Sequence, residues 1–288
     1  MPGVLFEGGS FRPVFSCGVM DALLEEDVMF PYCIGVSAGA ADAASYVSRQ
    51  QGRNIRVFER FRNDKRYVGK RNLLRERSLF GLQFVFRDVP NIEEPFDMEA
   101  FQAYQGNFLI TVTDAETGMV HYFTQKDVDR NFLPIQASCS LPVFFPPVEI
   151  NGRYYYDGGL ANPIPIDKLV HDGHRKALIV LTRPKGYQKI CSRTDRMAAR
   201  AIEHKYPMTA RRIRVRYKRY NMAVEACERL EREGRAVLIR PSEPIDSYEK
   251  DVARLRYFYE QGYGLAKEKM REIKGLFDYG SGSISRCL

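Results

Sequence analysis

The chain has 288 residues, of which 44% are hydrophobic and 28% charged, so it is long enough for one large globular domain or a domain with an added lobe. It contains no run of eighteen apolar residues, and its start lacks the basic and apolar stretches of a signal peptide. We therefore expect neither a membrane-spanning helix nor a cleaved leader.

The net charge of +8 is concentrated in two blocks. Ten Lys and Arg residues stand against three acids in residues 53–77, and ten stand against two acids in residues 193–219. Such blocks are typical of solvated helix faces, and they also suit contact with an anionic membrane or nucleic acid.

Strands and helices alternate along the predicted chain. A strand at residues 3–6 leads through a glycine-rich turn into a helix that starts at Pro13, whose missing N–H suits the first helical position. A buried strand ends near residue 34, and an alanine-rich helix follows at residues 38–47.

Later segments continue this pattern. The expected strands are residues 108–113, 119–124, 176–182 and 236–240, with a hairpin at 148–156 that turns at Asn151-Gly152. Helices are expected at 196–233 with a break at Pro207, and at 247–273 with interruptions at Gly262 and Gly264. The alternation predicts an α/β sandwich with a mainly parallel sheet, and no clean linker divides it.

Ser37 lies in the pentapeptide Gly35-Val36-Ser37-Ala38-Gly39. Gly-x-Ser-x-Gly at the end of a strand is the signature of a nucleophile elbow, in which the glycines allow a tight strand-to-helix turn. A serine that attacks a carbonyl needs donors for the oxyanion and a base for its proton.

A glycine-rich turn, Glu7-Gly8-Gly9-Ser10-Phe11-Arg12, opens the first helix. Free backbone N–H groups at such a turn suit an oxyanion hole or a phosphate site, and an ordinary turn is the third alternative. The spacing fits neither Gly-x-Gly-x-x-Gly nor a Walker loop, which disfavours a nucleotide site.

The base is harder to find in the sequence. None of the four histidines (His121, His171, His174 and His204) lies in a motif, and too few residues precede Ser37 for the strands of an α/β-hydrolase. Asp157 in Asp157-Gly158-Gly159 is the other polar candidate, although Asp-Gly-Gly is also a common surface turn.

Taken together, the three elements resemble the patatin-like phospholipase family, most closely its single-domain bacterial members. The resemblance rests on Gly8–Arg12 (family pattern Gly-Gly-Gly-x-Arg/Lys), on the Ser37 pentapeptide and on Asp157-Gly158-Gly159. The segment at residues 137–148 also resembles the one that leads to the aspartate in that family. These motifs span residues 1 to about 182 in the family's order, and they imply a three-layer α/β/α sandwich.

The resemblance implies a Ser–Asp dyad without histidine, with Ser37 as nucleophile and Asp157 as base. Backbone N–H groups of Gly8, Gly9 and Ser10 are expected to hold the oxyanion, and no metal or cofactor is expected. The supporting residues are expected to be Arg12, Gly35, Gly39, Gly158 and Gly159.

One departure concerns Ser10, which replaces the family's third glycine. If that position requires positive φ, serine is disfavoured by roughly 1–2 kcal/mol. A second departure is Pro13, which follows Arg12 in place of the usual glycine, so a rearranged loop and reduced activity are expected consequences.

The implied function is hydrolysis of fatty-acyl esters of phospholipids or lysophospholipids through an acyl-enzyme. A less selective carboxylesterase is the near alternative. The rival is a weak or inactive patatin-fold protein that binds an anionic membrane or nucleic acid through its basic segments. We expect a lipid or acyl-ester substrate and no nucleic-acid partner; the sequence does not determine an oligomeric state.

We expect one domain, residues 1–280, with a motif-bearing part (1–182), a helical C-terminal part (193–275) and a flexible tail (281–288). The six cysteines show no metal-binding spacing and suggest reduced thiols in a cytoplasmic protein, with peripheral contact at the inner membrane surface as an option. The apolar stretch at 79–86 is consistent with two interpretations, a mobile flap over the site and plain core.

Overall fold

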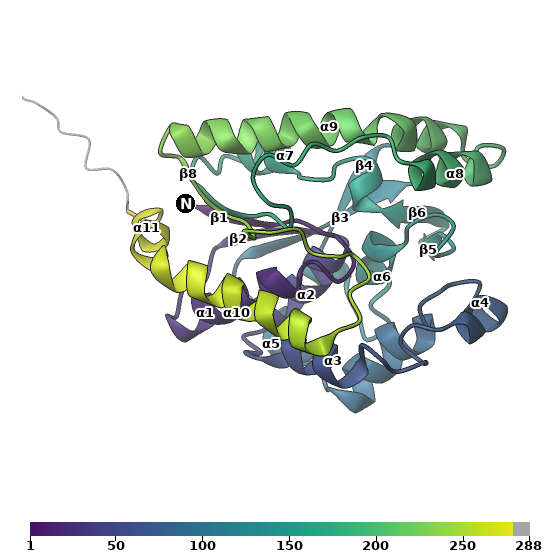
Figure 1. The fold of residues 1–288 in the computed structure, drawn as a ribbon, viewed down its shortest axis with the longest axis horizontal. Helices are drawn as coiled ribbons and strands as arrows, with labels where there is room; N and C mark the ends of the chain where they lie inside the picture. The colour runs from purple at the N-terminus through teal and green to yellow at the C-terminus, as the bar shows by residue number, and fades with distance from the viewer. Residues whose placement is uncertain (279–288) are drawn as a thin grey trace, which may run out of the picture.

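The computed structural model describes residues 1–278, which form an eight-stranded mixed sheet between two helical layers (Figure 1). The strands are β1 (Gly3–Phe6), β2 (Tyr32–Val36), β3 (Asn107–Asp114), β4 (Val120–Thr124), β5 (Val148–Ile150), β6 (Arg153–Asp157), β7 (Ala177–Val180) and β8 (Ala236–Ile239). Hydrogen-bonded pairs connect them in the path β5-β6-β3-β2-β1-β7-β8, and β4 also pairs with β3. The run β3-β2-β1-β7-β8 is parallel, whereas β4, β5 and β6 pair antiparallel. This confirms the predicted three-layer α/β/α sandwich.

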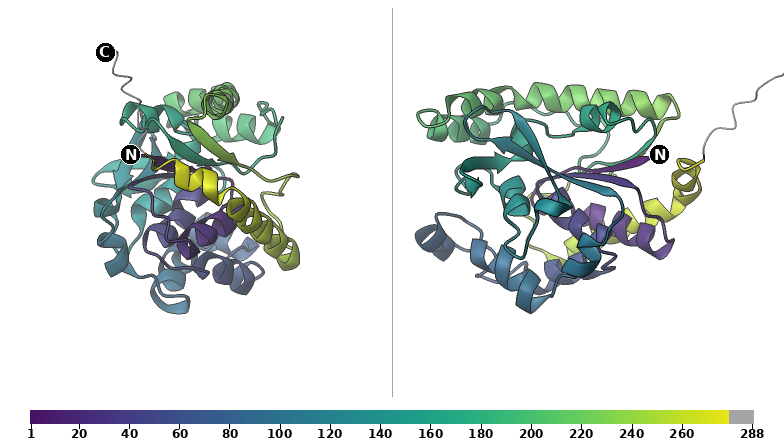
Figure 2. Two further views of the ribbon diagram at one scale, coloured as in Figure 1. Left: turned by 90° about the vertical axis from the view of Figure 1, so that its left-hand side faces the viewer. Right: turned by 180° about the vertical axis from the view of Figure 1, so that it is seen from behind.

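Helices cover both faces of the sheet (Figures 1 and 2). One layer holds α7, α8 and α9, and the other holds α1, α2, α3 and α10. The bounds are α1 (Val14–Glu25), α2 (Ala38–Val47), α3 (Arg53–Phe61), α4 (Lys70–Glu76), α5 (Met98–Gln102), α6 (Leu133–Cys139), α7 (Ile166–His171), α8 (Arg193–Ile202), α9 (Pro207–Arg232), α10 (Val252–Glu268) and α11 (Met270–Gly275). Three further segments are the π-helical η1 (Phe84–Glu93) and the single turns η2 (Gln125–Asp127) and η3 (Gly158–Leu160).

The central strands are apolar throughout because both of their faces are covered. Val4 and Phe6 of β1 pack into the core beneath α1 and α2, whereas Leu5 packs into the core beneath α7 and α9. Every residue of β1, β7 and β8 is buried. This double burial explains why these strands read as continuous apolar runs without alternation.

Two strands share one edge of β3, and this arrangement positions the site. β2 pairs with the first part of β3 and ends with Val36 opposite Thr111, whereas β6 runs the other way and ends with Asp157 opposite Val112. β4 pairs with Leu109–Thr113 and overlaps both registers, so it lies on the opposite edge. β2 and β6 therefore meet end to end, and the residues that follow their ends face each other.

The two helices α1 and α10 touch backbone to backbone. A Cβ atom on Gly18 would lie 1.9 Å from the Tyr259 carbonyl oxygen, and one on Gly262 would lie 2.0 Å from the Phe15 carbonyl oxygen. The predicted interruptions at Gly262 and Gly264 are wrong, since α10 continues through both residues. Gly262 allows close packing here and does not break the helix.

Other boundaries differ slightly from the prediction. Pro13 lies in the turn directly before α1, and the last long helix starts at Val252 after Asp251, whose carboxylate accepts the N–H of Ala253 at 2.9 Å. Pro207 begins a new helix, which confirms the predicted break there.

The expected flexible tail at 281–288 lies outside the described residues. Within residues 1–278, no helix is long and apolar enough to cross a membrane.

The contact between α1 and α10 predicts opposite effects for two glycine substitutions. Gly18→Ala should lower the free energy of unfolding by about 1–3 kcal/mol, because its methyl group forces the two backbones apart. Gly264→Ala is the matched control: among residues 1–278 nothing lies within 4 Å of its Cβ position, and alanine should add about 0.5–1 kcal/mol of stability. Urea denaturation of both variants measures the difference. Equal stabilities would show that the helices do not touch at Gly18.

Candidate active site

Ser37 lies in a strained turn between β2 and α2. Its backbone has φ +56° and ψ −135°, a conformation that costs a non-glycine residue of order 1–3 kcal/mol. Both flanking glycines allow close packing: a Cβ on Gly35 would lie 2.5 Å from Cα of Ala40, and one on Gly39 would lie 2.6 Å from the Glu7 carbonyl oxygen. The turn therefore has the shape that the Gly-x-Ser-x-Gly pattern predicted.

Ser138 of α6 holds the Ser37 turn through a hydrogen bond to its backbone. The Ser37 N–H donates to Oγ of Ser138 at 2.8 Å, and that hydroxyl donates to the Thr111 carbonyl oxygen at 2.7 Å. Gly158 approaches the same carbonyl, since its Cβ would lie 2.2 Å from that oxygen. Sequence analysis did not assign Ser138 a role, although it noted the 137–148 segment that contains it.

Asp157 is 2% exposed and lies at the end of β6, beside the end of β2. Its Oδ1 accepts the Gly159 N–H at 2.7 Å. Among the described residues, none meets hydrogen-bond geometry toward its Oδ2, although the Ser37 hydroxyl approaches the carboxylate closely enough to affect its pKa. Burial raises the pKa of Asp157 to about 6, and the Ser37 hydroxyl, the Gly159 N–H and the charge of Arg216 oppose that rise.

The glycine-rich turn packs directly against Ser37. A Cβ on Gly8 would lie 2.5 Å from the Val36 carbonyl oxygen and 2.7 Å from Cβ of Ser37. Gly9 has φ +144° and Ser10 has φ +58°, so the third position does require positive φ. Serine there carries the expected cost of roughly 1–2 kcal/mol. In the part of the chain that the structure describes, the N–H groups of Gly9 and Ser10 have no backbone acceptor.

Arg12 and Thr182 hold this turn in place. The Gly8 carbonyl oxygen accepts the Thr182 hydroxyl at 2.9 Å and Nη2 of Arg12 at 3.4 Å. Arg12 also donates to Oγ1 of Thr182 at 3.3 Å and to the hydroxyl of Ser247. Because C=O and N–H point in opposite directions across a trans peptide, this anchoring turns the Gly9 N–H away from Thr182.

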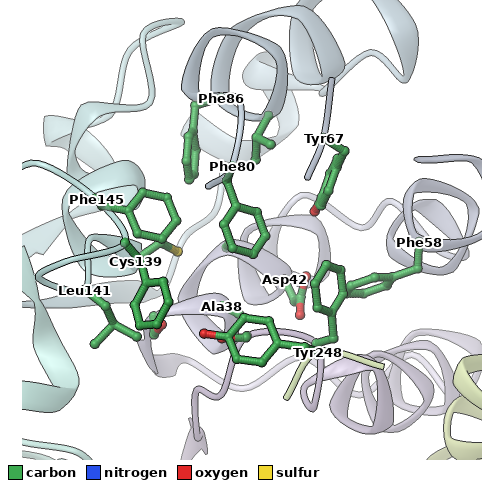
Figure 3. A pocket seen from close by; sticks show the side chains of 16 residues that line it. Ala38, Asp42, Phe58, Tyr67, Phe80, Phe86, Cys139, Leu141, Phe145 and Tyr248 are labelled. Carbon is green, nitrogen blue, oxygen red and sulfur yellow. The ribbon is translucent and has the colours of Figure 1, made fainter. Parts of the chain in front are cut away.

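An apolar pocket opens on one side of Ser37 (Figure 3). Its wall is mainly aromatic and includes Phe11, Phe58, Tyr67, Phe80, Phe86, Phe144, Phe145 and Tyr248. Phe80 stacks on Phe145 with ring centroids 5.3 Å apart. Of the apolar stretch at 79–86, Phe80, Val85 and Phe86 line this pocket, and Phe84 is buried against Phe61. The stretch therefore forms part of the pocket beside Ser37, and both alternatives for it, a mobile flap and plain core, stay predictions.

A polar pocket adjoins the apolar one, and Ser10, Ser37, Leu141, Phe144 and Tyr248 line both. The glycine-rich turn and Asp157 also line the polar pocket. Its other lining residues come from beyond the motifs and include Arg183, Lys189, Ser192, Thr194, Asp195 and Arg216. Sequence analysis missed these residues because no motif marks them and they converge only in the folded chain. No histidine of the described residues lines either pocket.

Asp42 is another buried acid at the site, and no motif in the sequence marks it. It lies on α2, lines the apolar pocket, and its Oδ2 has no hydrogen-bond partner among residues 1–278. Burial raises its pKa to about 7, although the Cys17 thiol and the charge of Arg53 lower it. The available signal was its position as the one charged residue of an alanine-rich helix.

Comparison with known proteins places this geometry in a family. The family model of the patatin-like phospholipases matches residues 4–170, and a model of a domain of unknown function (DUF6363) matches residues 206–278. The uncharacterized protein YjjU of Escherichia coli K12 is 23% identical over 185 residues, which cover 62% of this chain and 51% of that protein. The chain therefore spans about half the length of this curated relative.

The crystal structure of VipD from Legionella pneumophila aligns with 93% of this chain and 67% of that one, at 12% identity and a TM-score of 0.43. A similarity at this level adds no argument about function. The family model covers more than half of the chain and contains the Gly8–Arg12 turn, the Ser37 elbow and Asp157. The chain belongs to the patatin-like phospholipase family.

Proposed function

We propose that the chain is a serine acyl hydrolase that cleaves fatty-acyl esters of phospholipids or lysophospholipids. The observation that carries the proposal is the meeting of Ser37, on its strained turn, with the buried carboxylate of Asp157. The two side chains lie beside the glycine-rich turn; Ser37 lines both the apolar and the polar pocket, and Asp157 lines the polar one.

In the proposed reaction the Ser37 hydroxyl attacks the ester carbonyl while Asp157 takes its proton. The N–H groups of the Gly8-Gly9-Ser10 turn stabilise the oxyanion of the tetrahedral intermediate. Collapse of this intermediate breaks the bond to the alcohol, which leaves with the proton from Asp157. Asp157 then takes a proton from a water molecule as the water oxygen attacks the acyl-enzyme carbonyl. Collapse of this second tetrahedral intermediate breaks the acyl–Oγ bond, Asp157 returns the proton to the Ser37 oxygen, and the fatty acid is released.

The raised pKa of Asp157 supports its role as base. A carboxylate with a pKa of about 6 is mostly ionised at pH 7, yet it binds a proton more readily than an exposed aspartate. Its free Oδ2 is the atom that would accept the serine proton, since Oδ1 already accepts the Gly159 N–H.

The aromatic pocket supports a fatty-acyl substrate over the small esters of a general carboxylesterase. Ser37 and Ala38 line it, and its wall is mainly apolar. An acyl chain that leaves water there gains about 0.8 kcal/mol for each buried CH₂ group.

A catalytically weak binding protein is the rival. Strain at Ser10 favours it, but the anchoring of the Gly8 carbonyl by Arg12 and Thr182 keeps the turn ordered without a third glycine. Many basic side chains also have acidic partners, as in the pair Arg214–Glu203, which leaves fewer of them for an anionic surface. Cytoplasmic location, membrane contact and the single-domain boundaries stay predictions.

A fluorophosphonate probe tests the nucleophile. We expect it to label Ser37 in the wild-type protein, as located by peptide mass spectrometry, and to label Ser37→Ala not at all. Asp157→Asn should slow labelling by at least 100-fold, because the hydroxyl loses its base. Asp27→Asn, at an exposed ion pair with Arg49, is the matched control and should label normally. Unlabelled Ser37 in folded wild-type protein would favour the binding-protein alternative.

The pH dependence of hydrolysis tests the base. Asp157 must be ionised to accept the proton, so kcat/KM for a water-soluble acyl ester should be constant above pH 7. Below the pKa of about 6 it should fall about tenfold per pH unit. Initial rates from pH 4.5 to 8 give the profile. A profile without an inflection between pH 5 and 7 would remove Asp157 from this role.

The buried charge of Asp157 should reduce stability. Its pKa rises from 3.8 to about 6 on folding, so the folded state binds the proton more tightly and loses stability as the pH rises through this window. Asp157→Asn should therefore raise the free energy of unfolding at pH 7 by on the order of 2 kcal/mol, and by much less at pH 3.5. Chemical denaturation at both pH values measures it. A variant that is less stable at pH 7 would contradict a net cost of this charge.

A further inference from the structure

The polar pocket beside Ser37 has a basic wall that the proposed reaction does not use. Three cations form it: Arg183 after β7, Lys189 before α8, and Arg216 on α9. We call Arg183, Lys189 and Arg216 the basic wall. They line the same pocket as Ser37 and Asp157.

Two of these cations have no acidic partner in the described part of the chain. Within residues 1–278, neither Arg183 nor Lys189 forms an ion pair; the Arg183 guanidinium lies 4.6 Å from the centroid of the Tyr187 ring, and Nζ of Lys189 lies 5.7 Å from that of Tyr220. An aromatic face is a weak partner for a cation compared with an anion. Both charges are therefore available to a ligand.

Arg216 is only partly neutralised. Its guanidinium lies 3.5 Å from Oδ1 of Asp195, and its Nε is buried with no hydrogen-bond partner among the described residues. Asp195 is itself shared, because its other oxygen accepts the N–H and hydroxyl of Ser192. One carboxylate thus faces three cations at this wall.

More positive than negative side chains surround Lys189. Burial is the main cause that lowers the pKa of Lys189 to about 8, and the charges of Arg216, Arg12 and Arg183 lower it further against Asp195. The other acids of the pocket are Glu7, whose carboxylate accepts the Thr182 N–H, and Asp157. An anion at this wall would relieve the repulsion among the cations.

The wall is also fixed in position. The Lys189 N–H donates to the Asn221 side chain at 2.9 Å, and that side chain donates back to the Lys189 carbonyl oxygen at 3.1 Å. This pair of bonds ties the loop before α8 to α9. Ser192 and Thr194 at the start of α8 line the same pocket, where the helix dipole adds positive potential.

We propose that the basic wall binds the phosphate of a phospholipid whose acyl ester lies over Ser37. This inference rests on the proposed hydrolase function and adds to it the residues that recognise the phosphate group. The phosphate and acyl ester of a glycerophospholipid are only a few bonds apart, and Ser37 lines both the apolar and the basic pocket. The acyl chain enters the aromatic pocket and the phosphate contacts the basic wall, which selects phosphate-bearing esters over neutral ones.

Matched esters test this selection. The kcat/KM ratio of lysophosphatidate to a monoacylglycerol with the same acyl chain should exceed ten in the wild-type protein, and it should fall at least tenfold in Lys189→Met. Lys185→Met removes an equal charge from an exposed position of the same loop outside the pocket, and it should keep the wild-type ratio. Arg183→Gln is the second variant in case Lys189→Met does not fold. A ratio that both variants leave unchanged would overturn the inference.

A binding measurement separates this inference from the hydrolase proposal. By calorimetry, Ser37→Ala should bind lysophosphatidate more tightly than inorganic phosphate, and adding Lys189→Met should weaken both at least tenfold. If the variants bind in this way but the wild-type protein hydrolyses neither ester, the hydrolase function is refuted and the phosphate site is kept. Equal affinity for inorganic phosphate and lysophosphatidate would indicate a site for free phosphate and overturn the lipid assignment. No Lys189-dependent binding would overturn the site itself.

Discussion

The shared edge of β3 is the constraint on which the candidate site depends. β2 occupies that edge up to Thr111 and β6 occupies it from Val112, so the two strands end against each other. Ser37 directly follows the end of β2 and Asp157 is the last residue of β6, although 119 residues separate the two in the chain. A shift of β6 along β3 would move the carboxylate away from the hydroxyl, because the hydrogen-bond register fixes the position of every residue on the strand.

Two features at this meeting point lower the stability of the fold. Ser37 takes a backbone conformation that is unfavourable for a side chain, and Asp157 keeps a carboxylate away from water. Neighbouring contacts hold both in place: Ser138 binds the Ser37 N–H and Gly159 binds one carboxylate oxygen. Strain and a buried charge that persist beside a pocket are typical of functional sites, where the surrounding structure determines the geometry.

The two parts of the chain contribute differently to the site. The segment that matches the family model supplies the residues assigned to the reaction, namely the turn, the elbow and the aspartate. The basic wall comes from the loop between β7 and α8 and from α9, outside that segment. The C-terminal part also adds β8 to the sheet and packs α10 on α1, so it contributes to the central sheet as well as to the pocket.

The sequence by itself determined the alternation of strands and helices, the elbow at Ser37 and the turn before α1, because short-range rules for glycine, proline and apolar runs specify these features. It misjudged Gly262, since a glycine that breaks a helix and one that lets two helices touch have the same local signature. Only the tertiary structure decided which side chains share a pocket with Ser37. Lys189 and Arg216 converge there through long-range packing, and the pKa of Asp157 depends on burial by segments far from it in the chain, which no local pattern encodes.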